Sequence, residues 1–132
     1  MIEHYAARTR ALYTWEEYDL ERRRGVRPLD SEREGRRVID EFWSVKHCRP
    51  PRLHIRKIKG HPYCEGRCLI VLSPANHRNI TLLHEITHAH GYGGVVNQHN
   101  QAFVRAYIAL LAQFFKWDAG ELTCQAIMRG LL

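Results

Sequence analysis

The segment His84-Glu85-Ile86-Thr87-His88 decides how the rest of the chain is interpreted. On an α-helix, side chains four positions apart project from one face, so the rings of His84 and His88 can reach one metal ion at about 2.0–2.1 Å. Glu85 lies about 100° further round the helix, beside the two rings, where a general base must stand. The spacing therefore predicts a helix with two metal ligands and one catalytic carboxylate.

A catalytic zinc ion commonly has three protein ligands and one open position for water. His99 is the predicted third ligand, and His90 and Glu121 are the alternatives. His90 lies about 200° round the helix from His88 and points away from the pair, whereas Glu121 fits the capping pattern of a later helix. Three glycines within residues 91–94 allow the chain to turn back and return His99 to the pair.

The same residues have an ordinary structural interpretation. A His-Glu-x-x-His segment arises by chance in a sequence of this composition about one time in twenty, so its context has to support it. If no metal binds, His84 and His88 are hydrogen-bonded core or surface histidines and Glu85 is a solvent-facing acid.

Hydrophobic periodicity predicts two helices in the first part of the chain. The first covers about residues 3–24. The second begins after Asp30 and Ser31, which supply capping oxygens, and buries a stripe that extends to Trp43 and Val45. Beyond it, residues 53–59 alternate apolar and polar side chains, as in a half-exposed strand, and residues 67–72 form an apolar run typical of a buried strand, with a turn at residues 60–66 between them.

Three helices are predicted in the second part. The metal helix is expected to be capped by Asn76 or Asn79 and to stop near Gly91. A long helix is predicted from about residue 97, with His99 in its first turn. Residues 118–131 open with a capping pattern and form a final short helix with buried residues that include Ile127.

The 132 residues suit one domain, and the net charge of +6 is concentrated in its first part. Residues 1–60 contain fifteen Lys and Arg against ten Asp and Glu. Arginines at 22–24, at 33, 36 and 37, and at 49, 52 and 56 are able to face phosphate groups, so nucleic acid is a candidate partner. Because acidic residues are interleaved among them, a solvated charged surface is the alternative.

Four cysteines, Cys48, Cys64, Cys68 and Cys124, accompany no export signal and no membrane-spanning run. We therefore expect reduced thiols and a soluble, cytoplasmic protein that binds no membrane. Cys64 and Cys68, with His61 just before them, are a conceivable second metal site, although two thiols flanking a turn explain the spacing better.

The segments His84 to His90 and His99-Asn100-Gln101-Ala102-Phe103 resemble the SprT-like and related small zincin-type metallopeptidases, and look closest to the small bacterial and phage metallohydrolases of that type. The likeness covers about residues 53–117. It implies an α+β fold of minimal zincin type, with helices packed on a small, mostly antiparallel sheet and the histidine helix at the centre. Residues 1–48 would be N-terminal helices and 118–132 a C-terminal helix of the same single domain.

The resemblance also implies one zinc ion bound by His84, His88 and His99, with Phe103 packed beneath the third ligand. Asn100 stands where the family pattern favours glycine, and no paired Cys-x-x-Cys of a zinc ribbon is present. The edge strand of the sheet is expected to receive an extended peptide through added backbone hydrogen bonds.

We therefore expect a zinc metallopeptidase in which zinc activates a water molecule and Glu85 takes its proton during attack on a peptide or protein substrate. Tyr92 is the candidate stabiliser of the developing oxyanion, and Tyr63 has a similar claim. The alternative is a non-catalytic zinc-containing adaptor that binds nucleic acid or protein through the basic N-terminal half.

Overall fold

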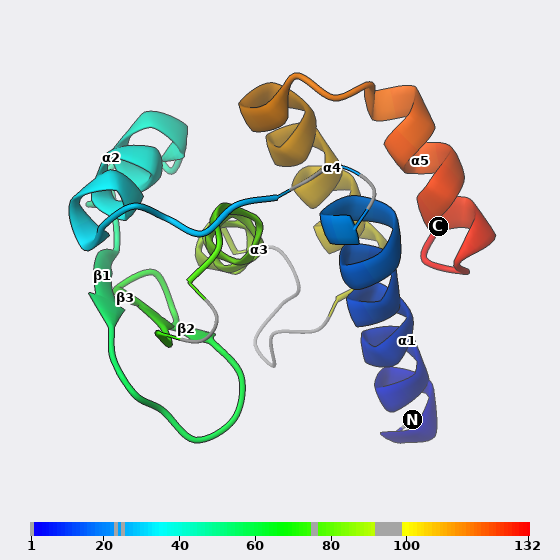
Figure 1. Cartoon of the computed structure of the whole chain (residues 1–132), viewed down its shortest axis with the longest axis horizontal. Coiled ribbons are helices and arrows are strands. Elements are labelled where there is room, and N and C mark those ends of the chain that lie inside the picture. Colours follow the sequence, from blue (N-terminus) through cyan, green and yellow to red (C-terminus); the bar gives the residue numbers. More distant parts are fainter. Residues whose placement is uncertain (1, 23, 25, 75–76, 92–98) are drawn as a thin grey trace. The chain divides into compact units, whose positions relative to one another are not determined.

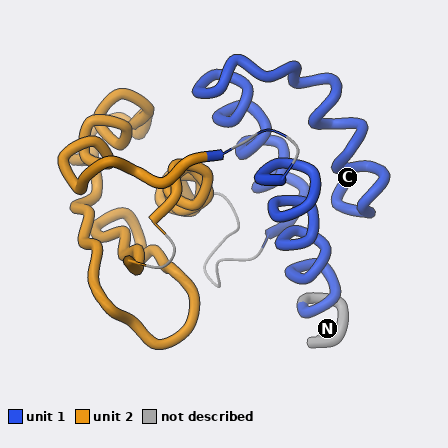
Figure 2. Tube along the Cα trace, in the orientation of Figure 1, with its two compact units in different colours: residues 1–26, 92–132 blue, residues 27–91 orange. Residues whose placement is uncertain are grey.

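The computed structural model describes residues 2–22, 24, 26–74, 77–91 and 99–132. The chain divides into two compact units, one formed by residues 27–91 and the other by residues 1–26 together with 92–132 (Figure 2). Unit 2 is the middle segment, and unit 1 is built from the two ends of the chain. Each unit is described separately below.

Unit 2 contains a three-stranded mixed sheet of β1 (Arg52–Ile55), β2 (Tyr63–Glu65) and β3 (Leu69–Leu72), in the order β1-β3-β2 (Figure 1). Strand β2 pairs with β3 in antiparallel fashion, but β1 pairs with β3 in parallel. The expectation of a mostly antiparallel sheet was therefore wrong. The cause is the connection after β1, which crosses to the far side of β3 before β2 begins.

The strands are shorter than their sequence patterns predicted. The apolar and polar side chains alternate over residues 53–59. Only Arg52–Ile55 pairs with β3, so β1 ends before the alternation does. Residues 60–66 were predicted as a turn, yet Tyr63–Glu65 is the strand β2. The hairpin turn follows it, where Gly66 has a positive φ of 53° and the Cys68 amide donates to the Glu65 carbonyl at 3.1 Å.

Helix α2 (Glu32–Phe42) begins where it was predicted, because the Ser31 hydroxyl accepts a hydrogen bond from the Glu34 amide at 3.2 Å. Gly35 is buried, and a Cβ atom placed there would lie 2.4 Å from the Leu53 side chain, so the helix approaches β1 closely at this point. Trp43 and Val45, predicted to continue the buried stripe, lie beyond the last helical residue.

Helix α3 (Asn79–Ala89) carries the histidine pair and packs against α2, β2 and β3. The N-cap of α3 is Arg78, which makes no side-chain capping bond. The prediction that Asn79 caps the helix was therefore wrong. The other predicted cap, Asn76, lies outside the described residues. Asn79 is instead the first helical residue. All residues of α3 except Thr81 are buried, so this helix forms the centre of the unit 2 core.

Unit 1 consists of α1 (Ile2–Thr14), the π-helix η1 (Trp15–Arg22), α4 (Gln101–Phe115) and α5 (Ala119–Met128). The single helix predicted for residues 3–24 therefore changes winding at Trp15, which the 3.6-residue period could not reveal. The Trp15 and Tyr107 rings pack edge to face in its core, with centroids 5.9 Å apart. One ion pair joins η1 to the residue that follows α5: the Asp19 carboxylate accepts two hydrogen bonds from the Arg129 guanidinium.

Two boundaries in unit 1 differ from their predictions. Helix α4 begins at Gln101, so His99 precedes the helix and does not lie in its first turn. In α5, the Asp118 carboxylate accepts from the Glu121 amide at 2.8 Å, as the capping pattern predicted, but Ile127 is 54% exposed and is not a core residue. None of the helices in the described part of the chain is long and apolar enough to cross a membrane.

Candidate metal centre

His84 and His88 project from the same face of α3, one turn apart. Their ring centroids are 5.1 Å apart, and the residues are 6% and 7% exposed. Ile80, Leu83 and Ile86 anchor the helix in the unit 2 core, which fixes the direction of this face. The predicted pair of neighbouring imidazoles is therefore present in the structure.

Glu85 is only 4% exposed, so it is not the solvent-facing acid of the non-metal interpretation. Burial of the Cys64 thiol in β2 raises the pKa of Cys64 to about 12, and the negative charge of Glu85 contributes next. The thiol itself donates a hydrogen bond to the Gly66 carbonyl at 3.0 Å.

His99 belongs to unit 1, where neighbouring side chains hold its ring. The Nδ1 atom lies 3.5 Å from the Thr9 hydroxyl, and the His99 carbonyl accepts a hydrogen bond from the Arg8 guanidinium. The ring packs edge to face against Phe103 at 4.9 Å and Tyr13 at 6.1 Å between centroids. The predicted packing of Phe103 against the third histidine is therefore observed.

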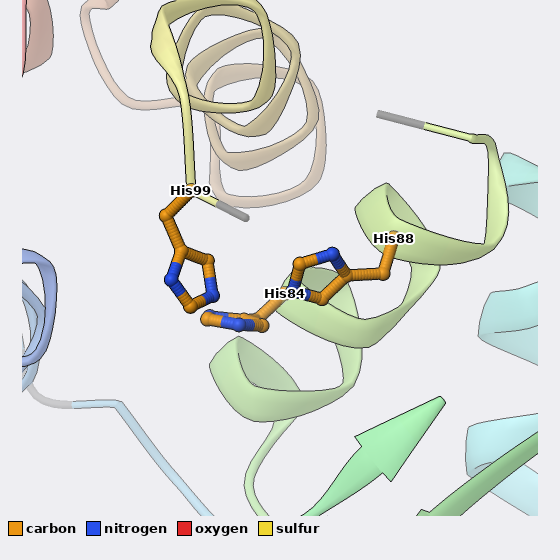
Figure 3. A group of neighbouring side chains, drawn as sticks. All are labelled: His84, His88 and His99. Atoms are coloured by element: carbon orange, nitrogen blue, oxygen red, sulfur yellow. The ribbon is translucent and has the colours of Figure 1, made fainter. Parts of the chain in front are cut away.

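One ring nitrogen from each of His84, His88 and His99 lies within 4.8 Å of the other two (Figure 3). All three residues are buried. Imidazole is a common ligand of zinc, and three protein ligands are the number that a catalytic zinc site uses. The donor set therefore fits a metal ion, and no other group of three such side chains occurs among the described residues.

The alternative ligands lie elsewhere. The His90 ring packs against Trp43 with centroids 5.0 Å apart, and its burial lowers the pKa of the imidazole. Glu121 is on α5 and forms an ion pair with Arg24 at 2.9 Å. All four cysteines are free, and Cys64 and Cys68 with His61 do not form a metal-binding group in the described part of the chain.

The candidate oxyanion stabilisers receive no support from the structure. Tyr92 lies outside the described residues. Tyr63 is next to Cys64 in β2, so strand alternation directs it to the opposite face of the sheet from the thiol near Glu85, and its hydroxyl accepts from Arg56 at 3.1 Å.

Sequence reasoning missed two contacts of the candidate site. Arg8 and Thr9 contact His99 across a separation of about ninety residues, and no local pattern announces such a contact. The proximity of Cys64 to Glu85 was missed as well, because β2 was not predicted.

No protein-family model, curated protein or solved structure matches the chain.

Proposed function

We propose that the chain is a zinc-dependent hydrolase, and specifically a peptidase, with His84, His88 and His99 as zinc ligands and Glu85 as general base. The observation that carries the proposal is the burial of Glu85 next to the histidine pair of α3. Leaving water costs the charged form of a carboxylate several kcal/mol. A cation held by the neighbouring histidines would offset part of that cost, and a general base must stand beside such a cation.

Zinc, when bound, supplies positive charge that lowers the pKa of a water molecule and polarises a carbonyl group. Three tetrahedral ligand atoms at 2.0–2.1 Å from one ion are about 3.3 Å apart, a separation compatible with imidazole nitrogens that lie within 4.8 Å of one another. The nitrogens must be uncharged to bind the ion.

Glu85 takes the proton of the attacking water and passes it to the leaving amine in this proposal. Strand β2 supports a peptide substrate because it pairs only with β3 among the described strands and packs against α3, the helix that carries Glu85. An extended peptide could add to the free edge of β2 through backbone hydrogen bonds.

The test combines metal content with peptide cleavage. We expect purified protein loaded with zinc to hold one ion per chain and to cleave members of a fluorogenic peptide library. Glu85→Gln should keep the ion and lose activity by about 10²–10⁴-fold, the usual contribution of a general base. Glu41→Gln, an exposed acid on α2, is the matched control and should retain activity.

Histidine variants test the ligand set separately. His84→Ala, His88→Ala and His99→Ala should each weaken zinc binding in a dye-competition assay, whereas His61→Ala, at an exposed turn, should not. Full activity in Glu85→Gln would reject the catalytic role. Unchanged zinc affinity in His99→Ala would reject the third ligand.

A further inference from the structure

A cleft of about 440 Å³ lies in unit 2 and is lined by residues of α2, of β1 and of the segment just before β1. Helix α2 packs beside β1 in this unit (Figure 1). We call this cleft the β1 cleft. Its polar lining consists of the side chains of Arg36, Asp40, Arg49, Arg52 and His54. The volume is within the range of ordinary ligand sites, about 300–1,000 Å³. None of these residues belongs to the candidate metal centre.

The β1 cleft is strongly positive. Three guanidinium groups face one carboxylate, that of Asp40. Arg36 forms an ion pair with Glu32 at 2.9 Å, but Arg49 and Arg52 have no acidic partner within the described residues. Two uncompensated guanidinium groups therefore lie in one concave site.

Three other arginines of the first part of the chain are paired with acids. Arg22 pairs with Glu17, Arg24 with Glu121 and Arg27 with Glu34, at 3.0, 2.9 and 2.7 Å respectively. The sequence alone could not distinguish these arginines from Arg49 and Arg52. Arg33 and Arg37 also lack an acidic partner among the described residues, but they do not line the cleft.

The backbone of β1 adds a donor to the cleft. The amides of Arg52 and Arg56 donate to Cys68 and Leu72 of β3, both at 2.9 Å, so the intervening amides of Leu53 and Ile55 are directed to the outer edge. The Ile55 amide donates to the Glu32 carboxylate at 3.0 Å. By the same alternation, the Leu53 amide is directed toward the cleft.

The chemistry of these donors fits phosphate. Guanidinium groups bind phosphate oxygens in a bidentate geometry, and a backbone amide adds a further charge-assisted bond. The remaining lining residues, Pro50, Pro51 and Leu53, offer no aromatic surface on which a base could stack. A nucleic acid would therefore be recognised here by its phosphate backbone, and its affinity would not depend on the base sequence.

We propose that the β1 cleft binds the phosphodiester backbone of a nucleic acid strand through Arg36, Arg49 and Arg52. This proposal does not rest on the proposed hydrolase function. The rim position of Asp40 weakens binding in the wild-type protein, so Asp40→Asn should bind more tightly.

The test measures fluorescence anisotropy of a labelled 20-nucleotide single-stranded DNA over a range of salt concentrations. Arg49→Ala combined with Arg52→Ala should lower affinity at least tenfold. It should also reduce the slope of log K against log salt by about 1.4, which is 0.7 for each lost phosphate contact. The matched control is Arg33→Ala with Arg37→Ala, which removes the same charge from exposed positions of α2 outside the cleft. It should keep affinity within about threefold.

Other outcomes overturn the proposal. An equal loss of DNA affinity in the two double variants would mean that DNA is attracted by the overall positive charge of the protein and does not bind specifically in the cleft. Displacement of the DNA by micromolar inorganic pyrophosphate would assign the site to a small phosphate ligand. Tighter binding of a labelled poly-glutamate peptide than of DNA would assign it to an acidic protein. Glu85→Gln should bind DNA as the wild type does, which keeps this test separate from that of hydrolysis.

Discussion

Thr9 is the residue whose contact with the candidate site is most informative. Its hydroxyl lies 3.5 Å from Nδ1 of His99, the arrangement in which a neighbouring polar group orients a metal-binding imidazole. Substitution of groups in that position typically costs 10–100-fold in metal affinity. We therefore expect Thr9→Val to weaken zinc binding by at least about tenfold in the dye-competition assay.

Thr14 supplies the control for this prediction. It ends the same helix, α1, and its hydroxyl donates only to the Arg10 carbonyl, at 2.8 Å. Thr14→Val should leave zinc affinity unchanged. Equal affinities in the two variants would contradict an orienting role for Thr9.

Cys64 gives a prediction about pH. Its pKa is about 12 in the folded protein, mainly because the thiol is buried, against about 8.5 for an exposed thiol. A raised folded-state pKa stabilises the fold fully below pH 8.5, and this contribution is lost as pH rises from 8.5 toward 12. Between pH 7.5 and pH 10 we expect the wild type to lose about 1–2 kcal/mol more unfolding free energy than Cys64→Ala.

Urea denaturation at the two pH values measures this difference. The comparison with Cys64→Ala removes the effect of every other group that titrates in the range. A constant difference between the two proteins would show that the folded and unfolded thiols ionise alike. Cys68 is exposed and should react with a thiol reagent at pH 8 well before Cys64 does.

The start of helix α4 shows what Asn100 does in the structure. Asn100, which stands in the place of an expected glycine, has φ −72° and ψ 179°, an extended conformation that requires no glycine. Its side-chain oxygen accepts from the Phe103 amide at 2.9 Å. Asn100 is therefore the N-cap of α4, immediately after His99.

We expect Asn100→Ala to lower the unfolding free energy by about 1 kcal/mol, because it leaves a helix amide without its acceptor. Asn100→Asp keeps the acceptor and should be close to the wild type in urea denaturation. Asn100→Gly should cost only a few tenths of a kcal/mol. A loss in the aspartate variant as large as that in the alanine variant would contradict the capping role.

The sequence predicted those elements that have strong local signals. Ser31 and Asp118 identified two helix starts, and the His84 and His88 spacing predicted the face of α3. Strand β2 was missed because three residues are too few to establish a period, and its pairing with β3 depends on contacts beyond the turn. The contact between Thr9 and His99 is equally non-local.

At the scale of the whole molecule, zinc bound by His84, His88 and His99 should raise the stability of the folded chain. A ligand that binds only the folded state at a free concentration of 100 times its Kd stabilises by about 2.7 kcal/mol. We expect zinc to raise the melting temperature by roughly 10 °C, and EDTA to reverse the rise.

His99→Ala is the decisive variant in this measurement. It should abolish most of the rise in melting temperature with zinc, whereas His61→Ala should retain it. A full zinc response in His99→Ala would mean that His99 is not a ligand. No response in the wild type would reject the metal centre.

The order of the units along the chain also bears on biosynthesis. Residues 27–91 are synthesised before residues 101–132, so the sequence of unit 2 is complete before α4 is made. Trp15 is made long before Tyr107, the ring against which it packs in the folded chain. Until that ring is synthesised, Trp15, which is fully buried in the folded chain, lacks this cover in the nascent chain.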